Sequence, residues 1–529
     1  MKTVFMRQSI VRVVFFMGIL AGSFSCQNAE KPKHVKKQSS SQASEKLNVL
    51  FIIADDLNCD LGAYGNNIVQ TPNIDRLAAR GVVFENAHNQ YPLCGPSRAS
   101  FMTGMYTNQT KITENNMNLR NSVPDVITLG QRFRQQGYQS VRIGKMFHYD
   151  NPSAIGTSGN DDIYSWDQTV NPYGRDKIEE HKINTLIPRR YGGTLSWLAA
   201  NGKDEEQTDG IGANEAIEKL DDFSKNGTPF FLAVGFFRPH TPFVAPKKYF
   251  ELYDREEIEI PESSDSYLKT LPEPAAKSIR AKKVQLNLEK ELAQEIKEAY
   301  YATISFVDAQ VGRVLDHLEA SGLDKNTIVV FTSDHGYHMG EHGHWQKQTL
   351  FENATRIPLI ISMPRIESTA IAPKRTMSPV ELIDLYPTLM ELTDITIPEH
   401  VVGKSLKAVM KDENTLVRGS ALTRWRNGYS IKTRRYRLTA WGEKGALGYE
   451  LYDHQNDNSE LINLASNENY SELMDSLKIV LEQRISEASI KPDGLGRQIE
   501  NAKAMQKAKN ITFGDLHDKQ GKRTYLKEK

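Results

Sequence analysis

The sequence predicts an α/β protein with a large, mostly parallel β-sheet flanked by helices, followed by a small C-terminal α+β domain with an antiparallel sheet. Short apolar runs recur along the chain, amphipathic segments lie between them, and the pattern changes after about residue 416. The length of 529 residues also exceeds what one core can hold, because single cores stop growing at about 250–300 residues. We therefore expect two unequal domains.

Continuous apolar runs mark the strands of the large sheet. The run at residues 48–54 has polar flanks and no alternation, which is typical of a strand buried on both faces of a parallel sheet. Similar short runs follow at residues 140–143, 230–235, 327–332 and 359–362. Because helical segments separate several of these runs, we expect βαβ connections between them.

Helical periodicity is clearest between Leu292 and Leu318, where apolar residues recur every three or four positions. This spacing predicts a long amphipathic helix that leads into the strand at residues 327–332. A shorter helix is expected at residues 73–80. The segment 249–288 is rich in Pro, Glu, Ser and Lys, and we expect it to form an irregular excursion on the surface.

The C-terminal region has short β-rich runs at residues 429–433, 436–441 and 449–452, separated by Gly and charged residues. They predict a small antiparallel sheet, and a helix at residues 470–488 is expected to cover one of its faces. The chain as a whole is then divided into a signal peptide at 1–25, a tether at 26–47, a large domain at 48–414 and an α+β subdomain at 415–529.

The N-terminal segment is typical of a secretory signal peptide, with basic residues before an apolar run: Lys2, Arg7, Arg12 and residues 13–21. A transmembrane anchor is the alternative, but the run is shorter than the ~20 residues that a span needs. Cys26 stands where a bacterial lipoprotein is cleaved and acylated, and the polar stretch after it is expected to form a tether. We expect an exported periplasmic or cell-surface lipoprotein that touches the membrane only through this lipid.

Composition excludes some classes of partner. Lys plus Arg and Asp plus Glu both number 66, so no overall field favours nucleic acid or an acidic membrane surface. Only Cys59 and Cys94 follow the tether. Two cysteines are too few for a disulfide framework, although a single bridge between them is an alternative.

Acidic residues follow two of the predicted strands: Asp55 and Asp56 after the first, and Asp334 with His335 after the strand at 327–332. The carboxyl ends of parallel strands meet at one edge of a sheet, where ligands bind. Crowded carboxylates repel one another, and a divalent cation with oxygen ligands, such as calcium or magnesium, relieves this repulsion. The plain alternative is a pair of helix N-caps.

A short motif carries the most specific chemistry in the sequence. Residues 94–98 read Cys-Gly-Pro-Ser-Arg, and this Cys-x-Pro-x-Arg pattern resembles the signature at which type I sulfatases have their cysteine oxidised to formylglycine. Further blocks resemble that family in the same order, at residues 55–56, 71–75, 144–148, 238–242 and 333–336. Within the family the chain is most similar to the iduronate sulfatases, and the resemblance implies an alkaline-phosphatase-like sulfatase fold.

The resemblance also implies a mechanism and a set of site residues. A sulfatase-maturing enzyme would convert Cys94 to formylglycine, whose hydrate attacks sulfur through one hydroxyl and releases sulfate through the other. Lys145 and Lys347 would hold the sulfate, Arg98 and His148 would orient and deprotonate the hydrate, and His240 would protonate the leaving alcohol. The implied calcium ligands are Asp55, Asp56, the converted residue 94, Asp334 and His335.

Several of these roles have plain alternatives. Both lysines are equally compatible with solvated loop charges, and both histidines with ordinary hydrogen-bonded side chains. His335 fits calcium least well, because most sulfatases have Asn there. Zinc is an alternative metal, because the sequence has a histidine-rich tract: His335, His338, His342 and His344. The tract lacks the His-Glu-x-x-His arrangement, however.

The implied substrate is a sulfated polysaccharide or oligosaccharide, either a glycosaminoglycan or an ulvan-like algal glycan. Residues 150–201, expected to line the outer pocket, depart from the family, so the sugar and the sulfate position stay open. An arginine-rich stretch with Trp425 and Trp441, Arg424 to Arg437, either grips an acidic sugar chain or forms a solvated basic face. The alternative functions are a phosphate or phosphonate ester hydrolase and a non-catalytic lipoprotein that binds sulfated glycans.

Overall fold

The computed structural model describes residues 46–262, 265–364 and 374–505, and residues from 46 onward form one compact unit. The predicted signal peptide, Cys26 and nearly all of the tether lie outside the described residues. Among the described helices, none combines the length and the apolar composition that a bilayer span requires.

The central feature is an eight-stranded sheet. Its order is β14 (Lys374–Thr376), β2 (Val82–Phe84), β13 (Leu359–Ser362), β10 (Thr327–Ser333), β1 (Asn48–Asp55), β8 (Phe230–Pro239), β4 (Gln139–Gly144) and β5 (Gln168–Val170). Every neighbouring pair is parallel except the two pairs that β13 makes, with β10 and with β2. The predicted mostly parallel sheet is therefore confirmed. The reversed direction of β13 was not predicted.

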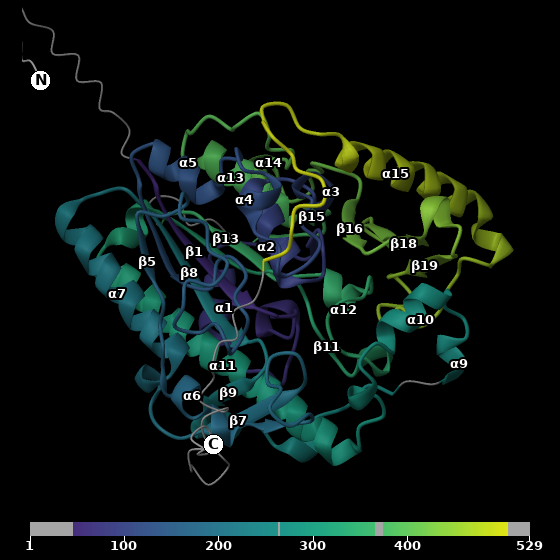
Figure 1. Cartoon of the computed structure of the whole chain (residues 1–529), viewed down its shortest axis with the longest axis horizontal. Helices are drawn as coiled ribbons and strands as arrows, with labels where there is room; N and C mark the ends of the chain where they lie inside the picture. Colours follow the sequence, from purple (N-terminus) through teal and green to yellow (C-terminus); the bar gives the residue numbers. More distant parts are fainter. Residues whose placement is uncertain (1–45, 263–264, 365–373, 506–529) are drawn as a thin grey trace, which may run out of the picture. The chain divides into compact units, whose positions relative to one another are not determined.

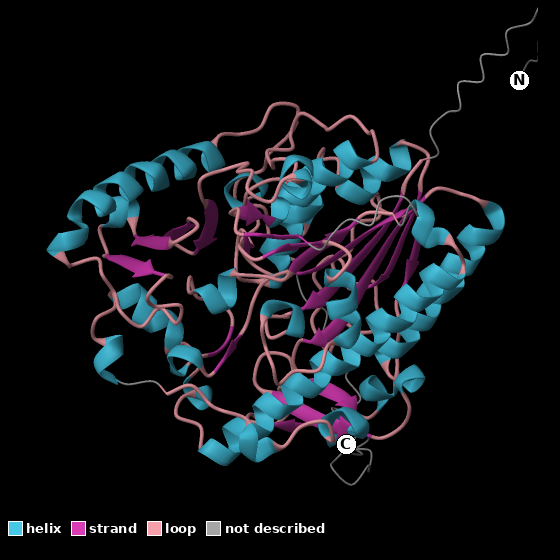
Figure 2. Ribbon diagram, turned by 180° about the vertical axis from the view of Figure 1, so that it is seen from behind, coloured by secondary structure: helices cyan, strands magenta, loops and turns pink. Residues whose placement is uncertain are grey.

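Helices cover both faces of this sheet, because β1 presents apolar side chains alternately to each face. Leu50 and Ile52 pack in the core formed with α1 (Pro72–Ala78), α7 (Thr208–Asn226) and α11 (Lys290–Ala320). Val49 and Phe51 pack in the core formed with α2 (Cys94–Thr103), α5 (Leu129–Gln135) and α13 (Leu385–Leu392). Figures 1 and 2 show these two layers on either side of the strands.

The segment 249–288 is only partly the irregular surface excursion that we predicted. It carries α9 (Asp265–Leu268) and α10 (Glu273–Ile279), while α8 (Lys247–Phe250) overlaps its start. Ala275 and Ile279 of α10 are buried in one cluster with Trp425 and Trp441. The segment therefore packs against the C-terminal sheet.

That C-terminal sheet has four antiparallel strands in chain order, β16 (Ala421–Trp425), β17 (Gly428–Lys432), β18 (Tyr436–Trp441) and β19 (Tyr449–Asp453). Leu477 and Leu481 of α15 (Ser471–Ser489) pack in one cluster with Ile431 and Leu438. The antiparallel sheet and its covering helix are as predicted, with β16 as an additional strand. The boundary between residues 414 and 415 stays a prediction.

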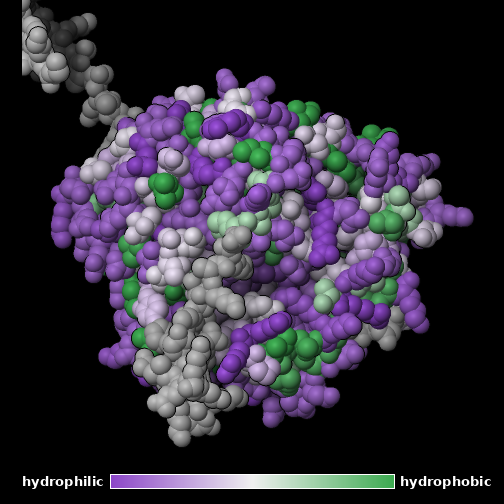
Figure 3. Space-filling model, viewed as in Figure 1, coloured by the Kyte–Doolittle hydropathy of each residue, from purple (hydrophilic) through white to green (hydrophobic). Residues whose placement is uncertain are grey.

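Arg437 ties this sheet to a helix that precedes β13. Its fully buried guanidinium donates to Glu460 at 2.5 Å and to Glu352 of α12 (Glu352–Thr355). A buried charge is tolerated only when it is paired, so α12 and β18 hold each other in place. The face of the molecule seen in Figure 1 is mostly hydrophilic, with groups of hydrophobic residues among the hydrophilic ones (Figure 3).

Candidate active site

Four adjacent parallel strands end at the same edge of the large sheet, and each brings a predicted site residue to it. Asp55 ends β1, Asp334 follows β10, Lys145 follows β4, and His240 follows β8. All four side chains are buried. Residues far apart in the sequence thus meet at the edge where open α/β sheets bind ligands.

Lys145 reaches this edge because two glycines allow β4 and β8 to approach closely. The amide N of Lys145 donates to the carbonyl O of Gly235 at 2.8 Å, and a Cβ on Gly235 would lie 1.9 Å from the Lys145 carbonyl O. Gly144 before it has a φ of 70°, in the left-handed region that favours glycine. No larger side chain fits at Gly235 without moving Lys145.

Asp56 has a left-handed backbone, with a φ of 64°, directly after β1. Two hydrogen bonds hold it there: its amide N donates to Asp334 Oδ1 at 3.1 Å, and the Tyr300 hydroxyl donates to its carbonyl O at 2.9 Å. Such backbone strain persists only where surrounding contacts impose it, and it clusters at functional sites. The sharp turn allows Asp55 and Asp56 to enter the same site.

Arg98 organises the acidic side of the site from one turn into α2. Its fully buried guanidinium donates from Nε to Asp334 at 2.8 Å and from Nη2 to Asp55 at 3.0 Å. It also donates from Nη1 to the carbonyl O of Lys145 at 2.7 Å. One arginine therefore fixes the ends of β10, β1 and β4 relative to α2.

Cys94 is the first residue of α2 and lies at the centre of the predicted residues. Its Sγ is 3.1 Å from Lys347 Nζ, 3.3 Å from His335 Nε2 and 3.7 Å from Asp56 Oδ1. Both Cys94 and Cys59 are free thiols, so the alternative of a bridge between them is wrong.

The pKa values of the site follow from burial and from neighbouring charges. Burial raises the pKa of the Cys94 thiol far above its usual value, which Lys347 and Lys145 offset only in part. Burial also raises the pKa of Asp55 to about 7 against the charges of Lys145 and Arg98. A thiol reacts as its thiolate, so an unmodified Cys94 is a poor nucleophile at neutral pH.

The charges of the site balance in contact pairs, each carboxylate meeting a cation: Asp55 with Lys145 and Arg98, Asp334 with Arg98, and Asp56 with Lys347. Lys145 Nζ and Lys347 Nζ each lie 2.5 Å from their carboxylates. Burial alone would raise the pKa of Asp334, but Arg98 and His335 hold it well below its usual value. Three negative and three positive groups leave little net charge before any ligand binds.

The donor atoms fit a divalent cation. Two overlapping groups, whose ligand atoms lie within 4.8 Å of one another, are Asp55, Asp56, Cys94 and His240, and Asp56, Cys94, Asp334 and His335. Oδ2 of Asp56 is buried without a hydrogen-bond partner. Nδ1 of His335 lies 3.0 Å from the Gly336 carbonyl O, which can only accept, so its Nε2 lone pair faces the group.

His240 has a fixed tautomer. Its Nδ1 lies 2.6 Å from the Thr241 carbonyl O and therefore carries hydrogen, while its Nε2 lies 3.6 Å from Asp56 Oδ2. Burial lowers the pKa of His240 well below its usual value, against the attraction of Asp56. The Nε2 atom is thus the position at which this side chain gains or loses a proton.

His148 lies at the edge of the site. Its Nε2 lies 3.2 Å from Asp150, its Nδ1 is buried without a partner, and its hydrogen bonds among the described residues do not include Cys94. Burial lowers its pKa to about 4. The side chain lies on the wall of the pocket beside the site, and its predicted role stays a prediction.

That pocket has a volume of about 410 Å³ and opens beside Lys347, His148 and His240. Residues from the segment 150–201 form one wall, as we expected: Asp150, Asn151, Pro152, Ser153, Arg189, Tyr191, Gly192 and Gly193. Lys282 also lines the pocket, where its Nζ donates to the Gly193 carbonyl O at 2.9 Å and to Gln346. Sequence reasoning missed Lys282, because a lysine in a Lys-rich segment has the pattern of a solvated charge.

Lys347 follows a short hairpin of β11 (His338–Met339) and β12 (Trp345–Gln346). Both of its neighbours have left-handed backbones, Gln346 with a φ of 84° and Gln348 with a φ of 77°. His344 Nε2 lies 2.9 Å from the Lys347 carbonyl O. The hairpin therefore imposes the position of Lys347.

The histidine-rich tract supports this hairpin. His338 bonds Thr349 at 2.8 Å, and His342 stacks on Phe351 with ring centroids 4.1 Å apart. Among the described residues, the metal-ligand groups contain His335 but none of the other three histidines. The contacts of these three are those of structural side chains.

Buried cations, metal donors and an imidazole around one point are the groups that a hydrolase of anionic esters requires. Residues 47–395 match the family model described as Sulfatase, and residues 340–487 match that of the N-sulphoglucosamine sulphohydrolase C-terminal region. The chain belongs to the sulfatase family and is a sulfuric ester hydrolase.

Relatives with established names agree with this assignment. A sulfatase of Formosa agariphila is 36% identical over 473 residues, covering 86% of this chain and 89% of that protein. The iduronate 2-sulfatase of Mus musculus is 34% identical over 404 residues, covering 67% and 70%. The predicted family and its likeness to iduronate sulfatases are confirmed.

Solved structures confirm the alkaline-phosphatase-like fold. The phosphonate monoester hydrolase SpPMH from Silicibacter pomeroyi superposes with a TM-score of 0.70 at 21% identity, covering 85% of this chain and 97% of that one. Identity at this level establishes a shared fold and leaves the reaction to be argued from the site.

Proposed function

We propose that this enzyme removes sulfate from a sulfated polysaccharide or oligosaccharide, using a formylglycine made from Cys94 and a bound calcium ion. The single observation that carries this proposal is the position of Cys94, whose Sγ lies 3.1 Å from Lys347 and 3.3 Å from His335. The nucleophile, a sulfate-binding cation and the metal donors thus surround one point.

Conversion of Cys94 is favoured because the unmodified thiol is buried and its pKa is raised. A maturing enzyme would replace it with an aldehyde whose hydrate supplies an oxygen nucleophile. Arg98 would orient this group through its fixed position on α2, one turn from residue 94. His148, from the pocket wall, would take up the proton that the hydrate loses.

Calcium is favoured by the number of oxygen ligands that Asp55, Asp56 and Asp334 offer, since hard cations prefer oxygen. His335 would add one nitrogen. A bound divalent cation would supply positive charge that attracts the ester and stabilises the negative charge that develops on it.

The remaining roles follow from the pairs described above. Lys145 and Lys347 would turn from their carboxylates to the sulfate oxygens, because both carry donors at the centre of the site. His240 would deliver a proton from Nε2 to the departing sugar oxygen, because the negative charge of a bound ester would favour the protonated ring that burial alone disfavours. The Thr241 carbonyl keeps the ring in the orientation that this transfer requires.

A sugar substrate is supported by the chemistry of the pocket and by the relatives. Lys282, Arg189 and Lys347 line the pocket, against the single carboxylate of Asp150. Lys347 is paired with Asp56 and would hold the reacting sulfate, so Lys282 and Arg189 are the two cations that favour a second anionic group on the sugar. The similarity to iduronate 2-sulfatase favours a uronate, as in glycosaminoglycans or ulvan-like glycans.

We further propose export and attachment through a lipid on Cys26, on the sequence features of the N-terminal segment. Metabolic labelling with a fatty acid, comparing the natural chain with Cys26→Ser, tests this attachment. Loss of the label in the variant is expected, and an unlabelled natural chain would contradict it.

Desulfation of a panel of defined sulfated oligosaccharides, from heparin, chondroitin sulfate, dermatan sulfate and ulvan, tests the function. We expect sulfate release from at least one uronate-containing member, and none from Cys94→Ala. The main alternative is phosphonate or phosphate ester hydrolysis, which shares this fold. Faster turnover of a phenylphosphonate ester than of every sulfated sugar would overturn the proposal.

A further inference from the structure

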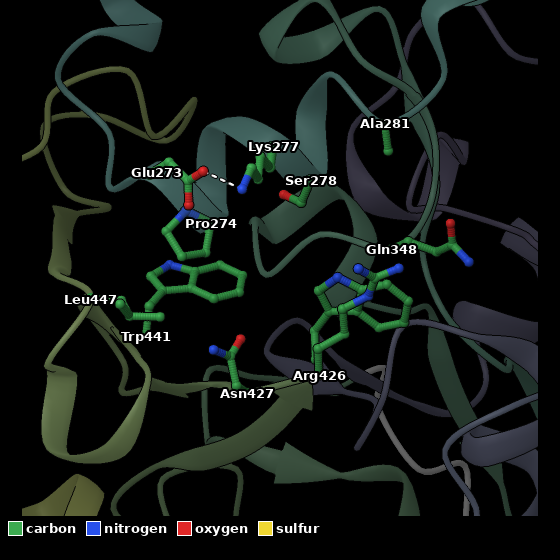
Figure 4. Close-up of a pocket in the computed structure, with 11 residues that line it drawn as sticks. Glu273, Pro274, Lys277, Ser278, Ala281, Gln348, Arg426, Asn427, Trp441 and Leu447 are labelled. Atoms are coloured by element: carbon green, nitrogen blue, oxygen red, sulfur yellow. Dashed lines mark ion pairs between the residues drawn. The ribbon is translucent and has the colours of Figure 1, made fainter.

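A second pocket lies beside the catalytic one, and we propose that it binds a further sugar of the same substrate chain. This distal pocket has a volume of about 260 Å³ and is lined by Glu273, Pro274, Lys277, Ser278, Ala281, Gln348, Trp425, Arg426, Asn427, Trp441 and Leu447 (Figure 4). The inference rests on the proposed function, since it concerns the length of glycan that the enzyme reads.

Gln348 connects the two pockets. Its side chain lines both the catalytic pocket and the distal pocket, and it follows Lys347 directly. Its backbone is left-handed, with a φ of 77°. A glycan whose sulfate lies at Lys347 would therefore meet Gln348 before it reaches the distal pocket.

Two indoles lie behind the apolar lining of the distal pocket, and only an edge of each is exposed, 6% of Trp425 and 2% of Trp441. Trp441 Nε1 donates to Glu450 at 2.6 Å, and the Trp425 ring meets the ring of Tyr91 edge-on with centroids 5.1 Å apart. Figure 4 shows the Trp441 ring directly below Pro274 and beside Leu447. These edges, with Pro274 and Leu447, give an apolar floor for the C–H groups of a sugar, and the buried indoles keep that floor rigid, which limits the entropy lost on binding.

Polar groups surround these indoles. Arg426 and Asn427 form the turn between β16 and β17, and Lys277 and Ser278 face them from α10 (Figure 4). Hydroxyl-rich ligands need such donors and acceptors around an apolar floor. The pocket therefore combines the two kinds of contact that a sugar makes.

Charge identifies the kind of sugar. Lys277 is paired with Glu273, whereas Arg426 has no carboxylate within ion-pair distance among the described residues; its guanidinium lies 5.3 Å above the Trp425 ring. One uncompensated arginine at the rim of a sugar-sized pocket favours a sulfate or carboxylate substituent. The expected occupant is an anionic sugar one or more units from the reacting one.

Most arginines of the stretch Arg424 to Arg437, which we expected either to grip a sugar chain or to be solvated, are held by other contacts. Arg435 is held by Asp453 at 2.6 Å, Arg437 is buried between two glutamates, and Arg424 donates to Asn108 at 2.8 Å. Among the arginines of the stretch, only Arg426 lines the distal pocket, while Arg434 lines a separate one. Arg434 is therefore a matched control within the same sheet.

The test compares chain lengths. For a disaccharide and a tetrasaccharide that share the same sulfated end, prepared from heparin and from ulvan, kcat/KM is measured with the mature enzyme, Arg426→Gln and Arg434→Gln. We expect Arg426→Gln to lower kcat/KM on the tetrasaccharide about tenfold, as for one lost charge-assisted hydrogen bond. Its activity on the disaccharide and on nitrophenyl sulfate should not change, and Arg434→Gln should match the natural enzyme on all three.

Two other outcomes overturn the inference in distinguishable ways. Equal kcat/KM on both lengths, or equal effects of the two arginine variants, would show that the distal pocket binds no sugar while desulfation still supports the proposed function. Turnover of nitrophenyl sulfate without release from any sulfated sugar would overturn both. Tryptophan fluorescence on titration with the tetrasaccharide gives an independent readout, because the natural enzyme should respond and Arg426→Gln should require more ligand.

Discussion

Nζ of Lys347 lies 3.1 Å from Sγ of Cys94 and 2.5 Å from Oδ1 of Asp56. One cation thus contacts both the residue predicted to become the nucleophile and a predicted metal ligand. Burial alone would lower the pKa of Lys347, but Asp56 and its neighbours raise it above the usual value. This lysine therefore stays charged at neutral and moderately alkaline pH.

The first prediction concerns the chemical state of residue 94. Coexpression with a sulfatase-maturing enzyme should convert Cys94 to formylglycine, and activity should rise in proportion to the converted fraction. Mass spectrometry of the peptide that spans residues 90–98 measures this fraction. Full activity in a sample that carries only unmodified cysteine would contradict the proposed nucleophile.

The second prediction concerns the metal. Exhaustive chelation should remove activity and lower the melting temperature, because a ligand at 100 times its Kd stabilises a protein by about 2.7 kcal/mol. Calcium should restore both properties better than zinc. Asp334→Asn should lose bound metal, as measured by elemental analysis, with less disruption than alanine because Arg98 keeps a hydrogen-bond acceptor. Full activity in metal-free protein would show that these carboxylates serve only the fold.

The third prediction assigns the general acid. His240→Ala should lower turnover of a sugar sulfate on the order of 10²-fold, within the usual range for general acid catalysis. Nitrophenyl sulfate has a good leaving group, so its turnover should fall far less. His317→Ala, on the surface beside Asp221, is the matched control and should leave both unchanged. Equal losses with His240→Ala on both substrates would pass the acid role to another group.

The fourth prediction is a pH dependence of substrate binding. Burial and the nearby charge of Lys347 lower the pKa of Lys282 to about 8, against the weaker attraction of Asp56. Lys282 is charged below that pH and loses its proton above it, so KM for an anionic oligosaccharide should increase as the pH rises through 8. Lys282→Arg should abolish this rise, because arginine stays charged. The same rise in the arginine variant would show that another group is responsible.

The fifth prediction concerns stability. Arg437→Ala should cost about 3 kcal/mol of unfolding free energy, because it removes the arginine that pairs with buried Glu460 and half-buried Glu352. Arg435→Ala breaks a pair with Asp453 whose arginine is 43% exposed, so its cost should stay below about 1 kcal/mol. Denaturant unfolding of both variants makes the comparison. Similar losses of unfolding free energy in the two variants would show that Arg437 does not couple β18 to α12.

The sequence was sufficient to predict the parts of the fold in which one physical signal dominates. The strand β1 was predictable because its side chains are buried on both faces, which requires an uninterrupted apolar run. The central part of α11 was predictable because its apolar residues keep a helical period. Cys94 and Arg98 were predictable because their motif resembles a known signature.

Other features depended on contacts that no local pattern reveals. The helix α7 was missed because its first turns contain Gly210, where a Cβ would lie 1.7 Å from the Asp204 carbonyl O; close packing, not a turn, requires that glycine. The direction of β13 was missed because an apolar run is the same in either orientation. Lys282 and the distal pocket arise only when residues from 273–282 pack beside the C-terminal sheet.

The complete burial of Cys94 has a consequence for how the cell must make this protein. None of its surface is exposed, and α2 around it is buried along its whole length. A modifying enzyme needs access to the side chain and its flanking backbone, so the proposed oxidation has to finish while the chain is still unfolded. Molecules that fold before the oxidation keep an unreactive cysteine. The relative rates of folding and oxidation therefore set the active fraction of every preparation.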